Sequence, residues 1–349
     1  MDRRRALRGV LALSATIVGG RGLAAFPAIV PPFTAQPGAT PAPLTSGGPG
    51  QWTWRASLPV PRSEVGVAEL DGKVYVVAEL DGKVYVVGGY ARGNVDQPLN
   101  QVDDPVADQW QTLASLPRGL NHVAVVGFNH RLYAFGGFTQ QNQDPVADVA
   151  VYDPAADGWS PLAPLPSPLG AMAVAELGGG LHLVGGRDTA SVTTHRIYDP
   201  TADQWSDAAP MRSARDHLAL APLGGRLFAA GGRLNTPASN LGVHEAYDPA
   251  SDSWEPRAPL PTPRSGVATA ALGGWMLVMG GERTGGVFAT NEAYDPSAAA
   301  WTTLQPLPSG RHGTGAGVVG NVAYVPGGGP VNGGSLQLDE NLAFGSATS

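Results

Sequence analysis

Short runs of apolar residues alternate with turn-forming residues from residue 51 to residue 345. In each unit a run of small residues comes first, and a second apolar run ends in two glycines, as in Leu132-Tyr133-Ala134-Phe135-Gly136-Gly137. Runs of this length, bounded by Gly, Asn or Asp turns, are typical of strands joined by tight hairpins. We therefore predict an all-β protein, with strands of small residues at 66–70, 123–126, 171–175, 218–221, 267–271 and 315–319.

The double glycines show that these runs belong to a repeat. They occur at residues 88–89, 136–137, 185–186, 231–232, 280–281 and 327–328. The first glycine of each of the last five pairs lies 26 residues after a tryptophan, at positions 110, 159, 205, 254 and 301. The period of 46 to 49 residues indicates six copies of one supersecondary unit, each of which buries its faces only against its neighbours.

Two further strands complete each unit. In four units the third ends at a Tyr-Asp-Pro turn, such as Tyr247-Asp248-Pro249, and in the first unit Asp103 replaces the tyrosine. The fourth strand carries the tryptophan, which we expect to pack between units. This order of motifs resembles the Kelch repeat, in which one unit forms one four-stranded blade of a β-propeller. The resemblance covers residues 51–345 and implies a single six-bladed propeller.

The two ends of the repeat region predict how the ring closes. The first element, Gln51 to Ala56, has the pattern of a fourth strand, whereas the last, Leu336 to Asp339, is expected to be a third strand with no tryptophan after it. We therefore expect the N-terminal strand to complete the sixth blade, so that no sheet edge stays open.

The first unit is ten residues too long, because residues 68–77 are repeated without change as residues 78–87. An extra strand would reverse every later strand of the blade and bring Gly88-Gly89 out on the wrong face. Expelling ten residues as a loop costs little, since loop-closure entropy grows slowly with length. We predict four strands, with residues 81–87 in their regular place and the surplus within 64–77.

The N-terminus differs from the rest of the chain. Residues 1–25 combine Arg3-Arg4-Arg5, an apolar run and the small residues Gly22-Leu23-Ala24, which is the pattern of a cleaved signal peptide. The basic run also resembles a twin-arginine export signal. Residues 26–50 are rich in Pro, Ala, Thr and Gly and are typical of a linker. We expect an exported bacterial protein, periplasmic or extracellular, with no transmembrane segment in the mature chain and, since there is no cysteine, no disulfide.

The charge of the chain limits its partners. Without residues 1–25, 17 basic and 28 acidic residues remain, a formal net charge of about −11. We expect no nucleic-acid partner, because phosphates demand a basic surface.

Arginines nevertheless recur at two fixed places in the repeat. Four lie ten residues after the phased tryptophan position, and two come directly after a double glycine: Arg62, Arg215, Arg264 and Arg311, and Arg187 and Arg233, respectively. The loops that carry them leave one face of a propeller, the usual ligand face of Kelch proteins. We predict that the first four surround one central opening and that the six bind an anionic peptide, protein or glycan. Pairing with Glu64, Asp216 or Glu282 is the structural alternative.

Histidines on the same face raise the question of a metal. His122, His217 and His312 lie 95 residues apart, in alternate blades. Strand alternation would turn His312 away from the other two, so we place His122 and His217 in the ligand site and expect no metal. We expect no cofactor either, because copper-radical chemistry of the galactose oxidase type needs a cysteine cross-linked to tyrosine.

Two functions from different classes fit these residues. The first is an exported module that binds an anionic peptide or glycan without chemistry. The second is an isomerase that resembles the bacterial Kelch-type sialic acid mutarotases, for which Glu64, His122 and His217 are the available acids and bases. A propeller fold by itself does not decide between them.

Overall fold

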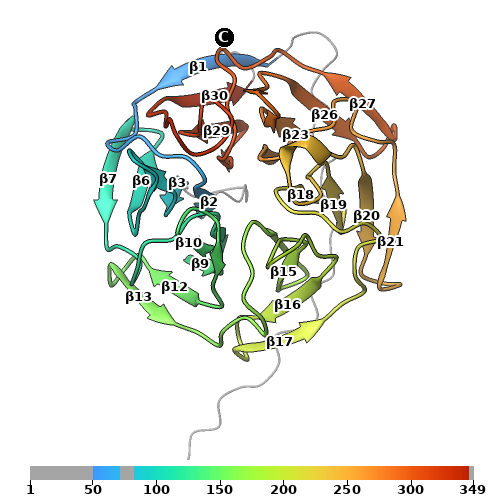
Figure 1. Ribbon diagram of the computed structural model, residues 1–349, viewed down its shortest axis with the longest axis horizontal. Coiled ribbons are helices and arrows are strands. Elements are labelled where there is room, and N and C mark those ends of the chain that lie inside the picture. Colours follow the sequence, from blue (N-terminus) through green and yellow to red (C-terminus); the bar gives the residue numbers. More distant parts are fainter. Residues whose placement is uncertain (1–49, 71–81, 346–349) are drawn as a thin grey trace, which may run out of the picture. The chain divides into compact units, whose positions relative to one another are not determined.

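The computed structural model describes residues 50–70 and 82–345, which form six four-stranded antiparallel sheets around one axis (Figure 1). The predicted six-bladed, all-β architecture is confirmed. From the axis outward, the blades are β2 (Gly66–Leu70), β3 (Lys83–Val87), β6 (Asn100–Asp104) and β7 (Gln109–Leu113); β8 (Ala124–Phe128), β9 (Arg131–Phe135), β12 (Val149–Asp153) and β13 (Gly158–Pro161); β14 (Ala173–Leu177), β15 (Gly180–Val184), β16 (His195–Asp199) and β17 (Gln204–Asp207); β18 (Ala219–Leu223), β19 (Arg226–Ala230), β20 (His244–Asp248) and β21 (Ser253–Pro256); β22 (Ala268–Leu272), β23 (Trp275–Met279), β26 (Asn291–Asp295) and β27 (Ala300–Thr303); and β28 (Gly317–Val319), β29 (Val322–Pro326), β30 (Asn341–Gly345) and β1 (Gln51–Arg55).

Smaller elements lie in the loops that join second to third strands. They are the two-residue ribbons β4 (Tyr90–Ala91) with β5 (Val95–Asp96), β10 (Phe138–Thr139) with β11 (Asp144–Pro145) and β24 (Glu282–Arg283) with β25 (Gly286–Val287), and the short helix η1 (Pro237–Ser239). Among the described residues, no helix has the length and apolar character that crossing a membrane requires.

The ring closes as predicted, because β1 pairs antiparallel with β30 and supplies the fourth strand of the last blade. Trp52 lies opposite Phe344 in this pair, as Trp159 lies opposite Tyr152 in the second blade. The predicted third strand at residues 336–339 is wrong, since the strand is Asn341–Gly345. Phe344 replaces the tyrosine here, and the missing Tyr-Asp-Pro turn removed the marker that sets the register.

Four of the blades are fastened to the preceding one by a clamp that we define by an alanine, a tryptophan and an aspartate. Trp159 donates its indole N–H to the carbonyl of Ala114 at 2.9 Å, and Asp157 accepts the N–H of the same alanine at 2.8 Å. Trp205 with Asp203, and Trp254 with Asp252, clamp Ala163 and Ala209 in the same way. The expected packing of the tryptophans between blades is confirmed, with a hydrogen bond added.

The first blade keeps four strands, as predicted for the duplicated segment. Its β2 and β3 pair in the regular register, Leu70 opposite Lys83, so the second copy of the duplication supplies the second strand. Gly89 donates to the Leu120 carbonyl just as Gly137 donates to the Leu169 carbonyl, which places its glycine pair on the same face as the others. The surplus is absent from residues 64–70, and residues 71–77 of the predicted bulge lie outside the described part of the chain.

Candidate functional site

A closed ring of backbone hydrogen bonds surrounds the axis at the start of the innermost strands. One residue of each blade takes part: Glu64, His122, Ala171, His217, Gly266 and Gly313. The N–H of each donates to the carbonyl oxygen of the member in the preceding blade, at 2.5 to 3.2 Å, and Glu64 closes the circle on Gly313. All six have φ between 51° and 64°. We call these six residues the axial ring.

The left-handed backbone of the axial ring is costly for four of its members. A side chain at positive φ costs about 1–2 kcal/mol, which is why glycine suits positions 266 and 313. Glu64, His122, Ala171 and His217 adopt this conformation although each has a Cβ. Such outliers persist where the surrounding structure fixes them, and they gather at functional sites.

The residue after each double glycine lies beside the axial ring. In the fourth blade, the backbone of Asp216 forms an isolated antiparallel β-bridge with that of Arg233, and in the fifth blade Ser265 forms one with Glu282. The six equivalent positions hold Tyr90, Phe138, Arg187, Arg233, Glu282 and Gly329. The backbone around these positions repeats from blade to blade, but the side chains are mostly different. These side chains therefore determine the chemistry at this end of the axis.

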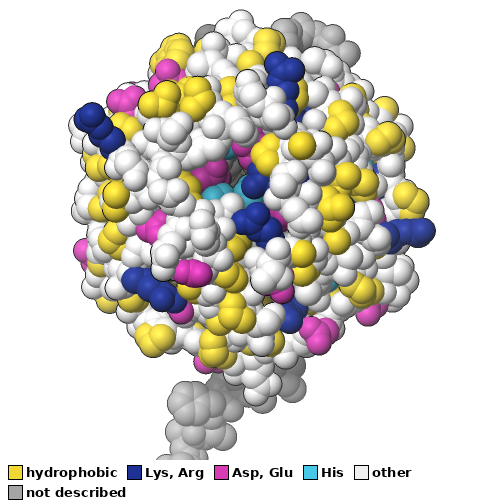
Figure 2. Space-filling model, in the orientation of Figure 1, with side chains coloured by type: hydrophobic (Ala, Val, Ile, Leu, Met, Phe, Trp, Pro, Cys, Tyr) yellow, Lys and Arg dark blue, Asp and Glu magenta, His cyan; other side chains and the backbone are white. Residues whose placement is uncertain are grey.

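A cluster of buried ionisable side chains fills this end of the axis. Its members, which we call the axial cluster, are Glu64, His122, Asp216, His217, Arg233, Glu282 and His312. Figure 2 shows histidine, acidic and basic side chains together in a central depression of this face. A cavity of about 300 Å³ opens above them, lined also by Tyr90, Arg187 and the side chains of Asn94, Asn142, Asn235 and Asn332.

Glu64 is held between two histidines. Its Oε2 lies 3.0 Å from Nε2 of His122, and its Oε1 lies 3.1 Å from Nε2 of His312. Burial favours the neutral acid, but the two histidines outweigh it, and the pKa of Glu64 lies well below its usual range. For His312, the carboxylates of Glu64 and Glu282 overcome the effect of burial and raise the pKa to about 9.

Asp216 and Arg233 fix the other side of the cluster. His217 donates Nδ1–H to Asp216 at 2.5 Å, and Arg233 donates to Asp216 at 3.0 Å and to Glu282. Burial and the positive charge of Arg233 lower the pKa of His217 to about 4. Asp216 is fully buried, and His217 and Arg233 hold its pKa below the usual range despite that burial.

The structure corrects the prediction for four arginines. Arg62, Arg215, Arg264 and Arg311 are 0–1% exposed and do not border an opening. Arg264 donates to the carbonyls of Gly280 (2.8 Å) and Val278 (2.7 Å) and forms an ion pair with Glu292 inside its own blade. At this shared position the guanidinium groups donate hydrogen bonds to backbone carbonyls at the double glycine. A ligand therefore cannot reach them in this structure.

The remaining predicted site residues come together. Arg187, Arg233 and His122 line the 300 Å³ cavity, and the rings of His122 and His217 contact each other with centroids 4.7 Å apart. The expectation for His312 is wrong, because the left-handed residue after it interrupts the strand alternation and its side chain turns back to the axis. Sequence reasoning missed the asparagines of the rim. Asn142 and Asn235 adopt a positive φ, which asparagine tolerates better than most residues, so asparagine in these loops was the available signal.

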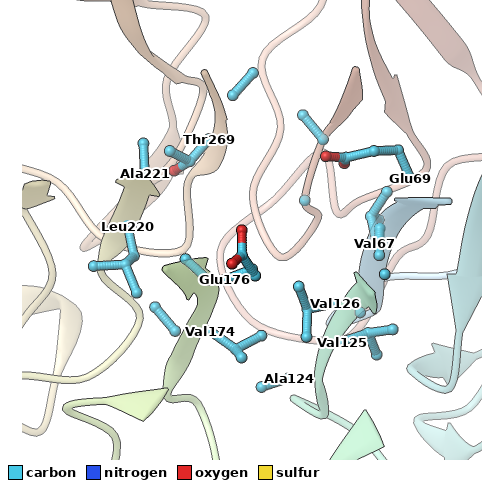
Figure 3. Close-up of a pocket in the computed structure, with 18 of the residues that line it drawn as sticks. Val67, Glu69, Ala124, Val125, Val126, Val174, Glu176, Leu220, Ala221 and Thr269 are labelled. Atoms are coloured by element: carbon cyan, nitrogen blue, oxygen red, sulfur yellow. The ribbon is translucent and has the colours of Figure 1, made fainter. Parts of the chain in front are cut away.

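A second cavity occupies the axis on the other side of the axial ring. It has a volume of about 700 Å³, and valine and alanine side chains of the innermost strands form most of its wall (Figure 3). Glu69 and Glu176 also line it. The ring therefore separates a polar cavity from a mostly apolar one.

Fold and site together define a six-bladed β-propeller with a polar pocket at one end of its axis. The Kelch motif model matches residues 120–166 and 263–308, which fall in the second and fifth units. Kelch motifs therefore occur in at least two of the six blades of this propeller.

Similar proteins agree with this identification over part of the chain. Beta-scruin of Limulus polyphemus is 30% identical over 105 residues, 29% of this chain and 10% of that protein. Kelch-like protein 25 of Xenopus tropicalis is 33% identical over 104 residues, 29% of this chain and 17% of its own. An F-box/kelch-repeat protein of Arabidopsis thaliana is 32% identical over 99 residues, 28% of this chain and 24% of its own. This chain thus spans less than a quarter of the length of each relative.

A solved structure, that of YjhT, matches the whole propeller. The TM-score is 0.67, and the match covers 82% of this chain and 95% of that one. With 16% sequence identity, the likeness concerns the fold alone.

Proposed function

We propose that this protein is a binding module whose ligand, an acidic glycan or an acidic peptide end, enters the 300 Å³ cavity above the axial cluster. The observation that supports this proposal most strongly is that Arg187 forms hydrogen bonds only to uncharged acceptors among the described residues. This half-buried side chain lies over the Phe138 ring and donates to the carbonyl (2.9 Å) and side-chain oxygen of Asn142 and to the carbonyl of Asn235 (3.4 Å). These acceptors are uncharged, so its positive charge is available to an anion in the cavity.

The rim of the cavity supports a ligand with many hydroxyl or amide groups. Asn94, Asn142, Asn235 and Asn332 contribute amides, which both donate and accept hydrogen bonds. Arg233, by contrast, is engaged by two carboxylates. Arg187 would therefore bind the anionic group, and the amides would bind the polar body of the ligand.

Titration of Arg187→Ala tests the proposal. With N-acetylneuraminic acid, glucuronic acid and acidic peptides as calorimetric probes, the unmodified protein should bind at least one, and Arg187→Ala should lose about tenfold to a hundredfold in affinity. Arg283→Ala is the matched control, because it removes the same charge from an exposed position in the same loop region of the fifth blade. Equal losses in both variants, or no binding of any acidic probe, would overturn the proposal.

An isomerase of the mutarotase type is the second candidate, and the adjacency of Glu64 and His122 favours it. A general base works best with a pKa near the working pH. The lowered pKa values of Glu64 and His217 make both weak bases, which is why binding is the first proposal. Mutarotation of an acidic sugar followed by NMR distinguishes the two, since a rate equal to the buffer rate leaves only binding.

Export stays a prediction, because residues 1–25 lie outside the described part of the chain. If the protein is exported, its ligand is one of the periplasm or the medium.

A further inference from the structure

Three side chains of the axial ring have the composition of a metal-binding site. Glu64, His122 and His217 each offer one ligand atom, and these atoms lie within 4.8 Å of one another. Two imidazoles and one carboxylate are a recurrent ligand set for zinc, with a further position left open. All three side chains project from the closed axial ring, so a rigid backbone circle carries them.

Both histidines are oriented as metal ligands are. His122 donates Nδ1–H to the side-chain oxygen of Asn121 at 2.6 Å, and His217 donates Nδ1–H to Asp216 at 2.5 Å. Each acceptor is the residue directly before the histidine. Such bonds fix the tautomer and direct the Nε2 lone pair toward a metal.

Glu64 is positioned in the same manner. His312 holds Oε1 at 3.1 Å, which leaves Oε2 on the side of His122. His312 is itself fixed, because its Nδ1 lies 3.1 Å from the carbonyl oxygen of Gly329. His312 thus serves as a positioning residue for the carboxylate.

The charges of the axial cluster favour a cation. Glu64, Asp216 and Glu282 are three carboxylates of at most 6% exposure, and Arg233 is the buried guanidinium among them. Buried charges need compensation. Arg233 and His312, each of which lies beside two of these carboxylates, offset part of this negative charge, and a divalent cation can offset the rest.

From these contacts we infer that Glu64, His122 and His217 bind a divalent first-row transition metal, with zinc as its representative, at the base of the 300 Å³ cavity. Because Glu64 and His122 line that cavity, a ligand oxygen or water in it would occupy the remaining coordination position.

Binding requires small movements. Ligand atoms around tetrahedral zinc, with bonds of about 2.0–2.1 Å, are roughly 3.4 Å apart. Oε2 of Glu64 and Nε2 of His122 are already 3.0 Å apart, and the wider separations in the group, at most 4.8 Å, must shorten. Two contacts must be exchanged for the metal: the bond that Arg233 donates to Nε2 of His217 at 3.0 Å, and the 3.0 Å contact of Nε2 of His122 with Oε2 of Glu64. The bonds of Arg233 to Asp216 and Glu282 are independent of that exchange.

The axial ring supplies the variants for a test. Ala171 occupies the same left-handed position as the histidines, so His122→Ala and His217→Ala introduce a residue that the ring already carries. His130, at an exposed turn between β8 and β9, provides the control His130→Ala. Thermal melting of each variant confirms that the propeller is folded.

The experiment is calorimetric titration of the full, EDTA-treated chain with Zn²⁺ alone. We expect one Zn²⁺ per chain, at least a tenfold loss of affinity in each of His122→Ala and His217→Ala, and no change in His130→Ala. Co²⁺ should give visible absorption bands that both site variants lose, whereas Mg²⁺ should not bind. Failure to take up one Zn²⁺ per chain, or unchanged affinity in the double variant His122→Ala/His217→Ala, would overturn the inference. Because no organic ligand is used, the result is independent of the glycan or peptide proposal.

Discussion

At the scale of single residues, the arginines show what a repeat pattern can and cannot distinguish. Arg264 and Arg187 both recur at fixed offsets in a loop that reaches the ligand face. One guanidinium is satisfied by carbonyls of its own blade, the other by loop amides beside a cavity. A guanidinium donates to either kind of acceptor with the same geometry. The path of the backbone determines which kind of acceptor an arginine meets, and that path cannot be read directly from the sequence.

The clamp between blades predicts a stabilising substitution, Ala299→Asp. Position 299 is equivalent to Asp252 and has the same left-handed backbone, φ 52° against 45°, but alanine has no acceptor there. An aspartate would accept the N–H of Ala258 and the hydroxyl of Tyr294, as Asp252 does for Ala209 and Tyr247. We expect the free energy of unfolding to rise by about 1 kcal/mol, measured by urea unfolding.

Asp252→Ala is the reciprocal control for this prediction. It converts the fourth blade's clamp into the form found in the fifth, so the midpoint of urea unfolding should fall. A lower midpoint in both variants would show that the aspartate is not the stabilising element of the clamp.

At the scale of elements, the third strand begins with a buried polar residue in five of the six blades. Five blades use Asn100, His195, His244, Asn291 and Asn341 at this place. His244 donates Nδ1–H to the carbonyl of Ala258, and Asn291 donates its amide to the equivalent carbonyl of Gln305. Histidine and asparagine therefore donate the same hydrogen bond at this place, but only histidine can take up a proton between pH 7 and pH 4.

Burial lowers the pKa values of His195 and His244 to about 4. Because the unfolded chain takes up protons near pH 6.5 and the folded chain does not, stability is complete above pH 6.5 and falls as the pH drops toward 4. Each histidine contributes up to about 3 kcal/mol to this fall. His244→Asn should flatten the dependence, whatever its effect at pH 7.

Guanidinium unfolding between pH 7 and pH 4 measures this slope. The control is His130→Asn, which replaces an exposed histidine and should follow the unmodified protein. A slope for His244→Asn as steep as that of the control would contradict the assignment.

At the scale of the whole molecule, the closing strand determines whether the propeller has an open edge. Deleting residues up to Arg55 would remove β1 and expose the backbone of β30. It would also remove the Trp52–Phe344 contact (centroids 4.9 Å apart) and the indole bond to Gln305. We expect a lower melting temperature and association through the free edge, seen by size-exclusion chromatography.

A chain that begins at Gly50 is the matched control, since it keeps β1 and removes the same preceding residues. If both truncated chains melt at the same temperature and stay monomeric, the closing strand does not stabilise the ring.

The fold was largely predictable because its determinants are local and occur six times. Double glycines, phased tryptophans and turns fixed the blade number, the closure and the four strands of the lengthened first blade. The strand at 341–345 was missed where a local marker, Tyr-Asp-Pro, is absent. The site was less predictable because it joins residues from different blades, such as Glu64 and His312, whose meeting depends on a left-handed turn that only the glycines at 266 and 313 signal.

The axial ring has a consequence for how the molecule opens. A linear array of repeats can fray from its ends, whereas a circle has none, so each of the six ring amides loses its acceptor only if a neighbouring blade moves away. These amides should therefore exchange their hydrogens in one cooperative event, together with global unfolding. The circle also favours six blades, because inserting a seventh would change the direction of all six backbone hydrogen bonds of the axial ring. The ten-residue duplication of the first blade lies between β2 and β3, outside this circle.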